Sequence, residues 1–142
     1  LLELTVDRTT IGQSTVSAGI QVFSGQAVIS NSVISQNNGP GILVGSLAEL
    51  DLFNSQINGN QVGVQVAANS TARIAGTNFA ANMADLLCDT PLDLESSNTL
   101  TGTLPSNCTI PPPEVVTTTP TPPLLRRAPL CFCPHFLFPM CP

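Results

Sequence analysis

The chain has little charge and few aromatic residues. Only 9% of its 142 residues are charged, its four cationic residues are all arginines, and its formal net charge is −5. A phosphate backbone is bound by clustered cations, so we expect no nucleic acid partner. No apolar run approaches the ~20 residues of a membrane-spanning helix, so we also expect no membrane insertion.

The residues that are abundant indicate strands rather than helices. Serine, threonine, asparagine, glycine and valine are frequent, a composition typical of β-rich proteins that often work outside the cell. The length leaves room for one domain and a tail. The chain begins with leucine and shows no signal-like segment, so we expect a fragment or processed form of an extracellular or cell-surface protein.

One sequence pattern occurs four times, and it is clearest within residues 27–66. There, residues 29–34 are followed by Asn37 and a Gly-Ile-Leu-Val run, and residues 52–57 are followed by Asn60 and Gly-Val-Gln-Val. The copies align at intervals of 22 or 23 residues in many columns. Three of these columns are Ile11, Ile34, Ile57 and Phe79; Leu4, Ala27, Leu50 and Ala72; and Ile20, Ile42, Val64 and Leu86.

Each copy of the repeat, here called a coil, alternates apolar and polar residues, as in Leu50-Asp51-Leu52. This period of two predicts short strands, and the Asn and Gly residues between them suit corners with positive φ. A single coil cannot bury its inner face, so we expect the coils to stack with equivalent strands about 4.8 Å apart. Side chains of one column would then form a ladder: Ser14, Asn37, Asn60 and Asn82.

The repeat I-x-N-S-x-I-x-x-N-x(2–3)-G-[IV]-x-V resembles that of the right-handed parallel β-helices of the pectate-lyase-like superfamily, over residues 2–88. The resemblance implies an all-β, right-handed parallel β-helix of about four coils. A leucine-rich repeat is the alternative, because residues 47–52 match part of that pattern. Serine replaces Leu47 in the neighbouring copies and the second half of each copy alternates as a strand, so we favour the β-helix.

The repeat weakens after Cys88. We expect residues 1–88 to form the coils and residues 89–110 to form a degenerate terminal coil or cap over the open end. Residues 111–142 begin with three prolines and are rich in proline and threonine at first, so we expect a disordered tail. The first coil would leave its core open, so we expect further coils or a capping helix ahead of Leu1.

All the cysteines lie at or beyond the end of the repeats: Cys88, Cys108, Cys131, Cys133 and Cys141. Cys88 and Cys108 either pin the cap through a disulfide, given an oxidising compartment, or are two unrelated thiols. The tail sequence Cys-Phe-Cys-Pro-His lacks the ligand spacing of a structural zinc site. The only histidine, His135, lies in this tail, so we expect no metal, no cofactor and no Ser-His-Asp triad.

Glu49 and Asp51 are the candidates for an acid pair, because both would face solvent from one strand with Arg73 one coil away. Glycosidases use paired carboxylates, and the resemblance implies lyases that bind calcium through acidic side chains. Those active sites need acidic residues on neighbouring coils, which this segment lacks, so a surface ion pair worth under ~1 kcal/mol is the favoured interpretation. A solvated acidic edge is expected near the cap, formed by Asp85, Asp89, Asp93 and Glu95.

Outward columns supply the candidates for ligand binding. Amide and guanidinium groups can hydrogen-bond a glycan, although a plain surface selected for solubility and β-propensity is the favoured interpretation. Phe53 is the one ring expected to be exposed on the coils, which leaves little aromatic surface for sugar stacking. The candidate binding residues are Gln21 and Gln65 on one face, Gln56 and Asn78 on another, and Arg73.

Two acceptor patterns for N-glycosylation are present, Asn69-Ser70-Thr71 and Asn107-Cys108-Thr109. Asn69 falls at an expected exposed corner, and occupancy of either asparagine needs a eukaryotic secretory route. A disulfide at Cys108 would compete with use of Asn107.

These patterns favour a non-catalytic, secreted or cell-surface β-helix module with a structural role, which contacts a polysaccharide or another surface protein. The alternative is a fragment of a polysaccharide lyase or glycoside hydrolase whose catalytic coils lie upstream. A ladder of acidic residues on adjacent coils would favour the enzyme, and this sequence has none.

Overall fold

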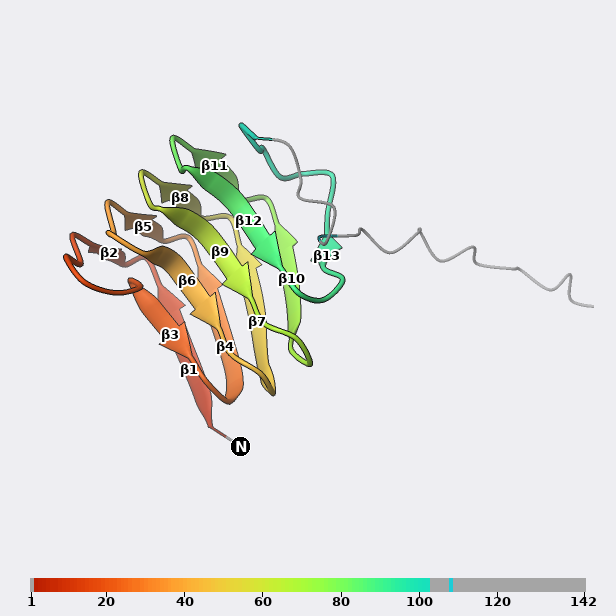
Figure 1. Ribbon diagram of the computed structural model, residues 1–142. Coiled ribbons are helices and arrows are strands. Elements are labelled where there is room, and N and C mark those ends of the chain that lie inside the picture. Colours follow the sequence, from red (N-terminus) through yellow and green to blue (C-terminus); the bar gives the residue numbers. More distant parts are fainter. Residues whose placement is uncertain (1, 103–107, 109–142) are drawn as a thin grey trace, which may run out of the picture. The chain divides into compact units, whose positions relative to one another are not determined.

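Three parallel sheets, A, B and C, form the part of the chain that the structure describes (Figure 1). The computed structural model describes residues 2–102 and Cys108, which lie in one compact unit, Leu1–Pro112. Sheet A contains β1 (Glu3–Asp7), β4 (Gly25–Ser30), β7 (Ala48–Phe53), β10 (Thr71–Ala75) and β13 (Asp93–Leu94). Sheet B contains β2 (Thr10–Gly12), β5 (Val33–Ser35), β8 (Gln56–Asn58) and β11 (Asn78–Ala80). Sheet C contains β3 (Ile20–Val22), β6 (Pro40–Val44), β9 (Val62–Val66) and β12 (Ala84–Cys88).

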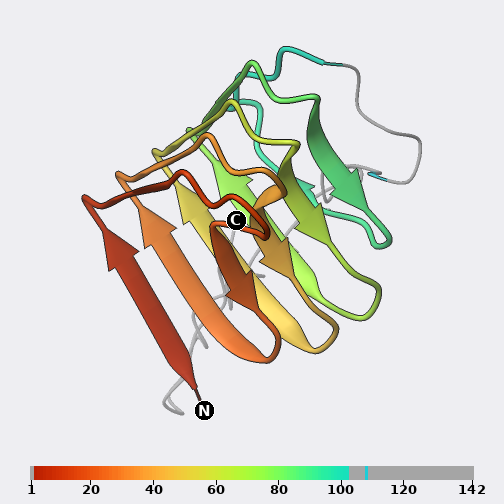
Figure 2. The ribbon, with the colours of Figure 1, turned by 60° about the vertical axis from the view of Figure 1, so that its left-hand side comes forward.

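Successive coils stack along one axis, so each strand lies beside its equivalent in the next coil (Figure 2). The register is the one that the sequence columns predict: Ile11 pairs with Ile34, Ile34 with Ile57, and Ile57 with Phe79. No helix occurs among the described residues, whereas a leucine-rich repeat would place a helical segment in each copy. The all-β parallel solenoid of about four coils is therefore confirmed.

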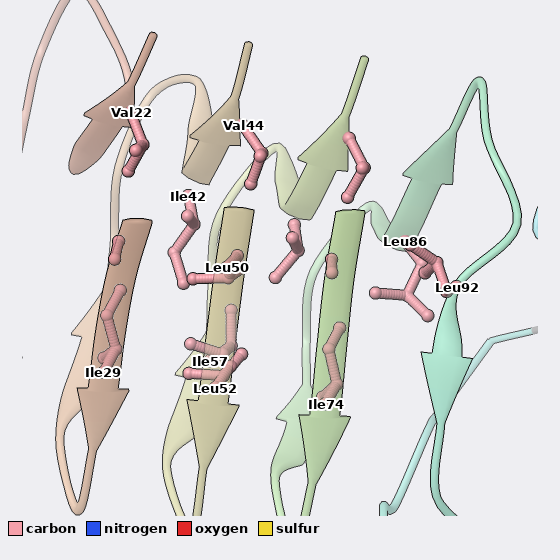
Figure 3. Packing of buried hydrophobic residues seen from close by; sticks show 14 of the residues in the cluster. Val22, Ile29, Ile42, Val44, Leu50, Leu52, Ile57, Ile74, Leu86 and Leu92 are labelled. Carbon is pink, nitrogen blue, oxygen red and sulfur yellow. The ribbon is translucent and has the colours of Figure 1, made fainter. Parts of the chain in front are cut away.

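The inward side chains of the three sheets meet in one core (Figure 3). Ile29 of sheet A, Ile57 of sheet B and Val64 of sheet C are each completely buried. Burying such a side chain contributes roughly 1.5–3 kcal/mol, and each coil obtains this burial only because its neighbours cover it. The first coil shows the difference, because Leu4 is 42% exposed while Leu50, in the same column, is 0% exposed.

A ladder of asparagines, buried at Asn37 and Asn60 and half-buried at Asn82, crosses the coils at one corner, as the sequence predicts. Asn37 Nδ2 donates to Asn60 Oδ1 at 2.9 Å, and Asn60 Nδ2 donates to Asn82 Oδ1 at 3.1 Å. The backbone N–H groups of Asn37 and Asn60 donate to the same two oxygens. The ladder therefore satisfies backbone donors that a turn would otherwise leave unpaired inside the protein.

A second ladder of hydroxyl groups lies at another corner, and sequence reasoning marked its column only as small and polar. The N–H of Thr9 donates to Ser32 Oγ at 3.1 Å, and the N–H of Ser32 donates to Ser55 Oγ at 3.2 Å. Each serine hydroxyl in turn donates to the carbonyl two residues before it. Small hydroxyl side chains suit this column because each can accept from the neighbouring coil and donate to its own backbone.

Glycine is required at one position in each of the first three coils because the next coil passes very close. A Cβ atom on Gly63 would collide with the carbonyl oxygen of Asp85 and lie 2.9 Å from Cδ1 of the Phe79 ring. The fourth coil has Asp85 in this column, at the point where the cap replaces a regular fifth coil.

The cap begins as a fifth coil and then departs from the repeat. β13 pairs with β10, and Thr99 forms an isolated parallel bridge with Asn78. Asp85 is buried, and its carboxylate accepts hydrogen bonds from the N–H groups of Thr101 at 2.7 Å and Gly102 at 3.0 Å. The expectation that Asp85 belongs to a solvated acidic edge is wrong, because its carboxylate fastens the cap to the fourth coil.

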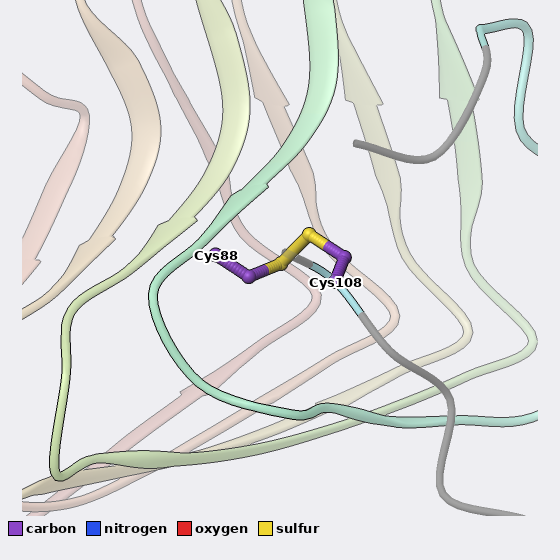
Figure 4. Close-up of a disulfide and its surroundings, with 2 residues drawn as sticks. All are labelled: Cys88 and Cys108. Carbon is purple, nitrogen blue, oxygen red and sulfur yellow. A yellow bond between two sulfur atoms is a disulfide. The ribbon is translucent and has the colours of Figure 1, made fainter. Parts of the chain in front are cut away.

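A disulfide joins Cys88, the last residue of β12, to Cys108, and both cysteines are buried (Figure 4). Of the two alternatives that the sequence left open for these thiols, the structure contains the bond. The expected disordered tail, the three tail cysteines, His135 and Asn107 lie outside the described residues.

Candidate functional site

Charged residues gather on sheet A. Within residues 2–102, every charged residue lies on a strand of this sheet or directly after one, except Asp85, which is buried, and Asp89, which follows β12. The outward faces of sheets B and C therefore carry no charge in the described residues. Among the described residues, the ionic groups available for recognition therefore lie mainly on sheet A.

A shallow groove of about 480 Å³ crosses the outward face of sheet A between the third and fifth coils. The parallel register places Asp51 of β7 beside Arg73 of β10, and Arg73 beside Asp93 of β13. Glu49 and Thr71, which are also paired in register, line the same groove. The acid pair and the cation that the sequence singled out are thus brought together on one surface.

The ionic partners within this groove differ from those expected. Gln26 Nε2 donates to Asp51 Oδ2 at 3.0 Å, so the nearest side-chain partner of Asp51 comes from the preceding coil. Arg73 Nη2 donates to Glu95 Oε1 at 2.8 Å, and Arg73 Nε lies 3.7 Å from Asp93 Oδ2. Arg73 therefore does form surface ion pairs, but with the two carboxylates of the fifth coil and not with Asp51.

Arg73 is held in position as well as neutralised. Its hydrogen bond to Glu95 and the negative charge of that carboxylate raise the pKa of the guanidinium above its usual value. The guanidinium carbon lies 5.5 Å from the centre of the Phe53 ring, within cation–π range. Arg73 therefore remains charged at all ordinary pH values, and its side chain is still about half exposed to a ligand.

The exposed aromatic ring of the coils is Phe23, not Phe53. Phe23 is 66% exposed where sheet C turns towards sheet A, whereas Phe53 is partly buried beside Arg73. The alternation in the sequence correctly predicts that Phe53 faces outward. It does not predict that the guanidinium of Arg73, in the next coil, lies over the ring.

Asp7, at the end of β1, provides a test of the side-chain bonds between coils. Its carboxylate accepts from Asn31 Nδ2 at 2.8 Å and from Ser30 Oγ at 2.7 Å, and these bonds lower its pKa below 3.8. We expect Asn31→Gly to raise the Asp7 pKa towards 3.8, measured by NMR titration. Glycine suits the positive φ of residue 31. An unchanged pKa would contradict this assignment.

The stability that these bonds contribute has a defined pH dependence. A carboxyl group with a depressed folded-state pKa adds stability above its unfolded pKa, and that stability is lost as the pH falls through the folded value. The contribution of Asp7 should therefore be complete at neutral pH and decline below about pH 4, the region of an unperturbed aspartate.

The other candidate binding residues do not form one site. Gln21 and Gln65 lie on outward positions of sheet C, and Gln56 and Asn78 lie on outward positions of sheet B. Only Arg73, among the candidates for ligand binding, lies on sheet A. Gln26, which sequence reasoning did not nominate, joins the groove residues through its bond to Asp51.

The described residues contain no group of three or more His, Cys, Asp or Glu side chains placed to hold a metal ion. Within the same part of the chain, no helix is long and apolar enough to cross a membrane.

One strand per coil in each of three parallel sheets around a common core defines the chain as a parallel β-solenoid. The family described as the right-handed β-helix region matches residues 3–110, so the chain belongs to that family. The family match establishes the right-handed β-helix that the repeat resembles, and it assigns no catalytic role. Comparison with curated proteins and with solved structures finds no match.

Proposed function

We propose that the chain is a non-catalytic module, secreted or displayed on a cell surface, that contacts carbohydrate or another surface protein through sheet A. One observation carries this proposal: Asp51 and Arg73, two of the polar side chains that line the groove, are fixed by bonds between coils. Gln26 orients Asp51, and Glu95 orients Arg73. A ligand would therefore meet hydrogen-bonding groups that lose little conformational entropy when it binds.

The chemistry of the groove suits a polysaccharide better than an apolar ligand. Asp51 and Glu49 accept hydrogen bonds, Arg73 donates them, and Thr71 can do both. Sugar hydroxyl groups need this mixture of donors and acceptors. Asp51 and Asp93 lie two coils apart, which corresponds to about 10 Å along the axis, so an extended chain could follow the stacked strands.

A glycan array with the full chain tests this proposal. Wild-type protein should bind a subset of polysaccharides, and Arg73→Gln and Asp51→Ala should each weaken binding by ~10-fold or more, because a hydrogen bond to a charged group is worth about 1.5–3 kcal/mol. Gln56→Ala is the matched control, because Gln56 is exposed on sheet B, away from the groove. This variant should bind as the wild type does. If all three variants weakened binding equally, the use of sheet A would be contradicted. The absence of any glycan or surface-protein ligand would also contradict the proposal.

The alternative is an enzyme of the lyase or glycosidase type, favoured by the presence of Glu49 and Asp51 on one strand beside a cation. The neighbouring coils place Gln26, Val28 and Thr71 next to these carboxylates, not further acids. Incubation with polygalacturonate and calcium, followed by ultraviolet absorbance of unsaturated products, separates the two functions. Turnover that Asp51→Ala abolishes would overturn the non-catalytic proposal.

A further inference from the structure

Asn69 occupies an exposed corner between β9 and β10, and it is the first residue of an Asn-Ser-Thr triplet. Its φ of 60° holds the backbone in the left-handed region, where asparagine is tolerated. The buried corner asparagines use their amides in the ladder, as Asn60 does. The Asn69 residue is exposed, and its side chain forms no hydrogen bond within the described part of the chain.

Leu47 lies next to Asn69, one coil earlier, and its exposure has no explanation within the fold. The Leu47 N–H donates to the Asn69 carbonyl at 3.1 Å, so the two residues stack at the same corner. Leu47 is 78% exposed and has a φ of 70°. A leucine in the left-handed region is strained, and here it gains nothing from burial. The exposed Leu47 side chain is therefore available to pack against a group attached to the protein at this corner.

The space around this corner is hollow. A cavity of about 310 Å³ is bordered by Leu47, Asn69 and Thr71, and it extends to Gln26 and Glu49 on sheet A. Its lining combines apolar side chains, those of Leu47 and Ala48, with several hydrogen-bonding groups. A sugar ring presents the same combination, because it has an apolar face and a hydroxylated edge.

We propose that Asn69 is an N-glycosylation site and that the innermost sugar of the glycan packs on Leu47 beside this cavity. In the transfer, Asn69 Nδ2 forms a bond to C1 of a lipid-diphosphate-linked oligosaccharide. The bond between C1 and the diphosphate oxygen breaks, the lipid diphosphate leaves, and Nδ2 gives up one proton to a base of the transferase. Thr71 supplies the hydroxyl that the acceptor pattern requires, and its side chain is exposed on the same surface.

The inference rests on the secretory route that the proposed function includes, but not on ligand binding by sheet A. A glycan at this corner would stand beside Gln26 and Glu49, at the edge of the groove. Glu49 and Thr71 border both this cavity and the groove, whereas Arg73 and Asp93 border the groove alone.

Expression of the full chain behind a secretion leader in a eukaryotic host tests the modification directly. We expect the peptide that contains Asn69 to carry an N-glycan by mass spectrometry, and peptide N-glycosidase to remove it with conversion of Asn69 to aspartate. Thr71→Val should abolish the modification while it preserves side-chain shape and β-propensity. Thr71→Ser, which retains the hydroxyl, is the matched control and should keep it.

Two results would overturn the inference. If the secreted protein carries no glycan on its Asn69 peptide, Asn69 is not a glycosylation site, whatever the state of Asn107. If a glycan is attached but shows no nuclear Overhauser contact between its first N-acetyl group and the Leu47 methyl groups, the proposed packing of the sugar on Leu47 is wrong. Because the leader directs secretion and mass is the readout, a failed glycan array leaves this test unaffected. Asn69→Asp, which tolerates the same φ, provides a second unmodified variant.

Discussion

Replacement of Ile57 by alanine is expected to lower the free energy of unfolding by about 4 kcal/mol. Ile57 is completely buried at the centre of sheet B, with Ile34 on one side and Phe79 on the other. Both neighbours are held by their own coils, so the cavity that the substitution leaves cannot close by a local shift. Chemical denaturation of the full chain, followed by circular dichroism, measures the change.

Gln56→Ala is the matched control for Ile57→Ala. Gln56 precedes Ile57 on the same three-residue strand, but its side chain is exposed. Substitution there should change the free energy of unfolding by no more than about 0.5 kcal/mol. If the two variants lost similar stability, the alternation of inward and outward side chains on β8 would be wrong, and the stacked core with it.

Replacement of Asn60 by leucine is expected to lower the free energy of unfolding by about 4 kcal/mol. Leucine has a similar size, but two or more buried polar groups would each lose a partner worth roughly 1–3 kcal/mol. Asn60 Oδ1 accepts from the backbone N–H of Asn37 at 3.0 Å, and Asn60 Nδ2 donates to the carbonyl of Ile34 at 3.1 Å. Each of these groups would lose this partner, and Asn37 Nδ2 would lose its bond to Asn60 Oδ1 as well. The same denaturation measurement applies.

Two controls separate the ladder from general effects of an Asn-to-Leu change. Asn78→Leu makes the same substitution at an exposed outward position of β11 and should change stability by no more than about 0.5 kcal/mol. Asn60→Asp keeps an acceptor for Asn37 but sets a carboxylate against the Ile34 carbonyl, so its folded-state pKa should rise. A raised carboxyl pKa means that stability increases as the pH falls, and a variant that loses stability in acid instead would contradict the ladder.

The fold could be predicted from sequence because of how a solenoid is built. Residues that touch in space, such as Ile34 and Ile57, are separated by one repeat in the sequence, so the alignment of the copies is also the contact map. The asparagine ladder followed for the same reason, since Asn37, Asn60 and Asn82 occupy one column. Sheet A likewise brought Glu49, Asp51 and Arg73 together as expected.

The candidate site could be predicted only in part, because side-chain pairing is not periodic. Arg73 has Asp51 on one side in register and Asp93 on the other, and the sequence alone gives no reason to prefer either. The choice depends on where the fifth coil ends, because that end brings Glu95 within 2.8 Å of the guanidinium. Phe23 was missed for a related reason, since its exposure depends on the path of a corner that varies between coils.

The sequence by itself determined the coil, its three strands, the inward and outward faces and the register between coils, because these properties repeat and each copy reinforces the others. The tertiary structure alone decided what happens where the repeat stops. The sequence predicts that Asp85 is one more surface acid, yet its carboxylate accepts hydrogen bonds from the backbone N–H groups of Thr101 and Gly102. These contacts join residues that share no column, so their energies depend on one local geometry that no repetition in the sequence records.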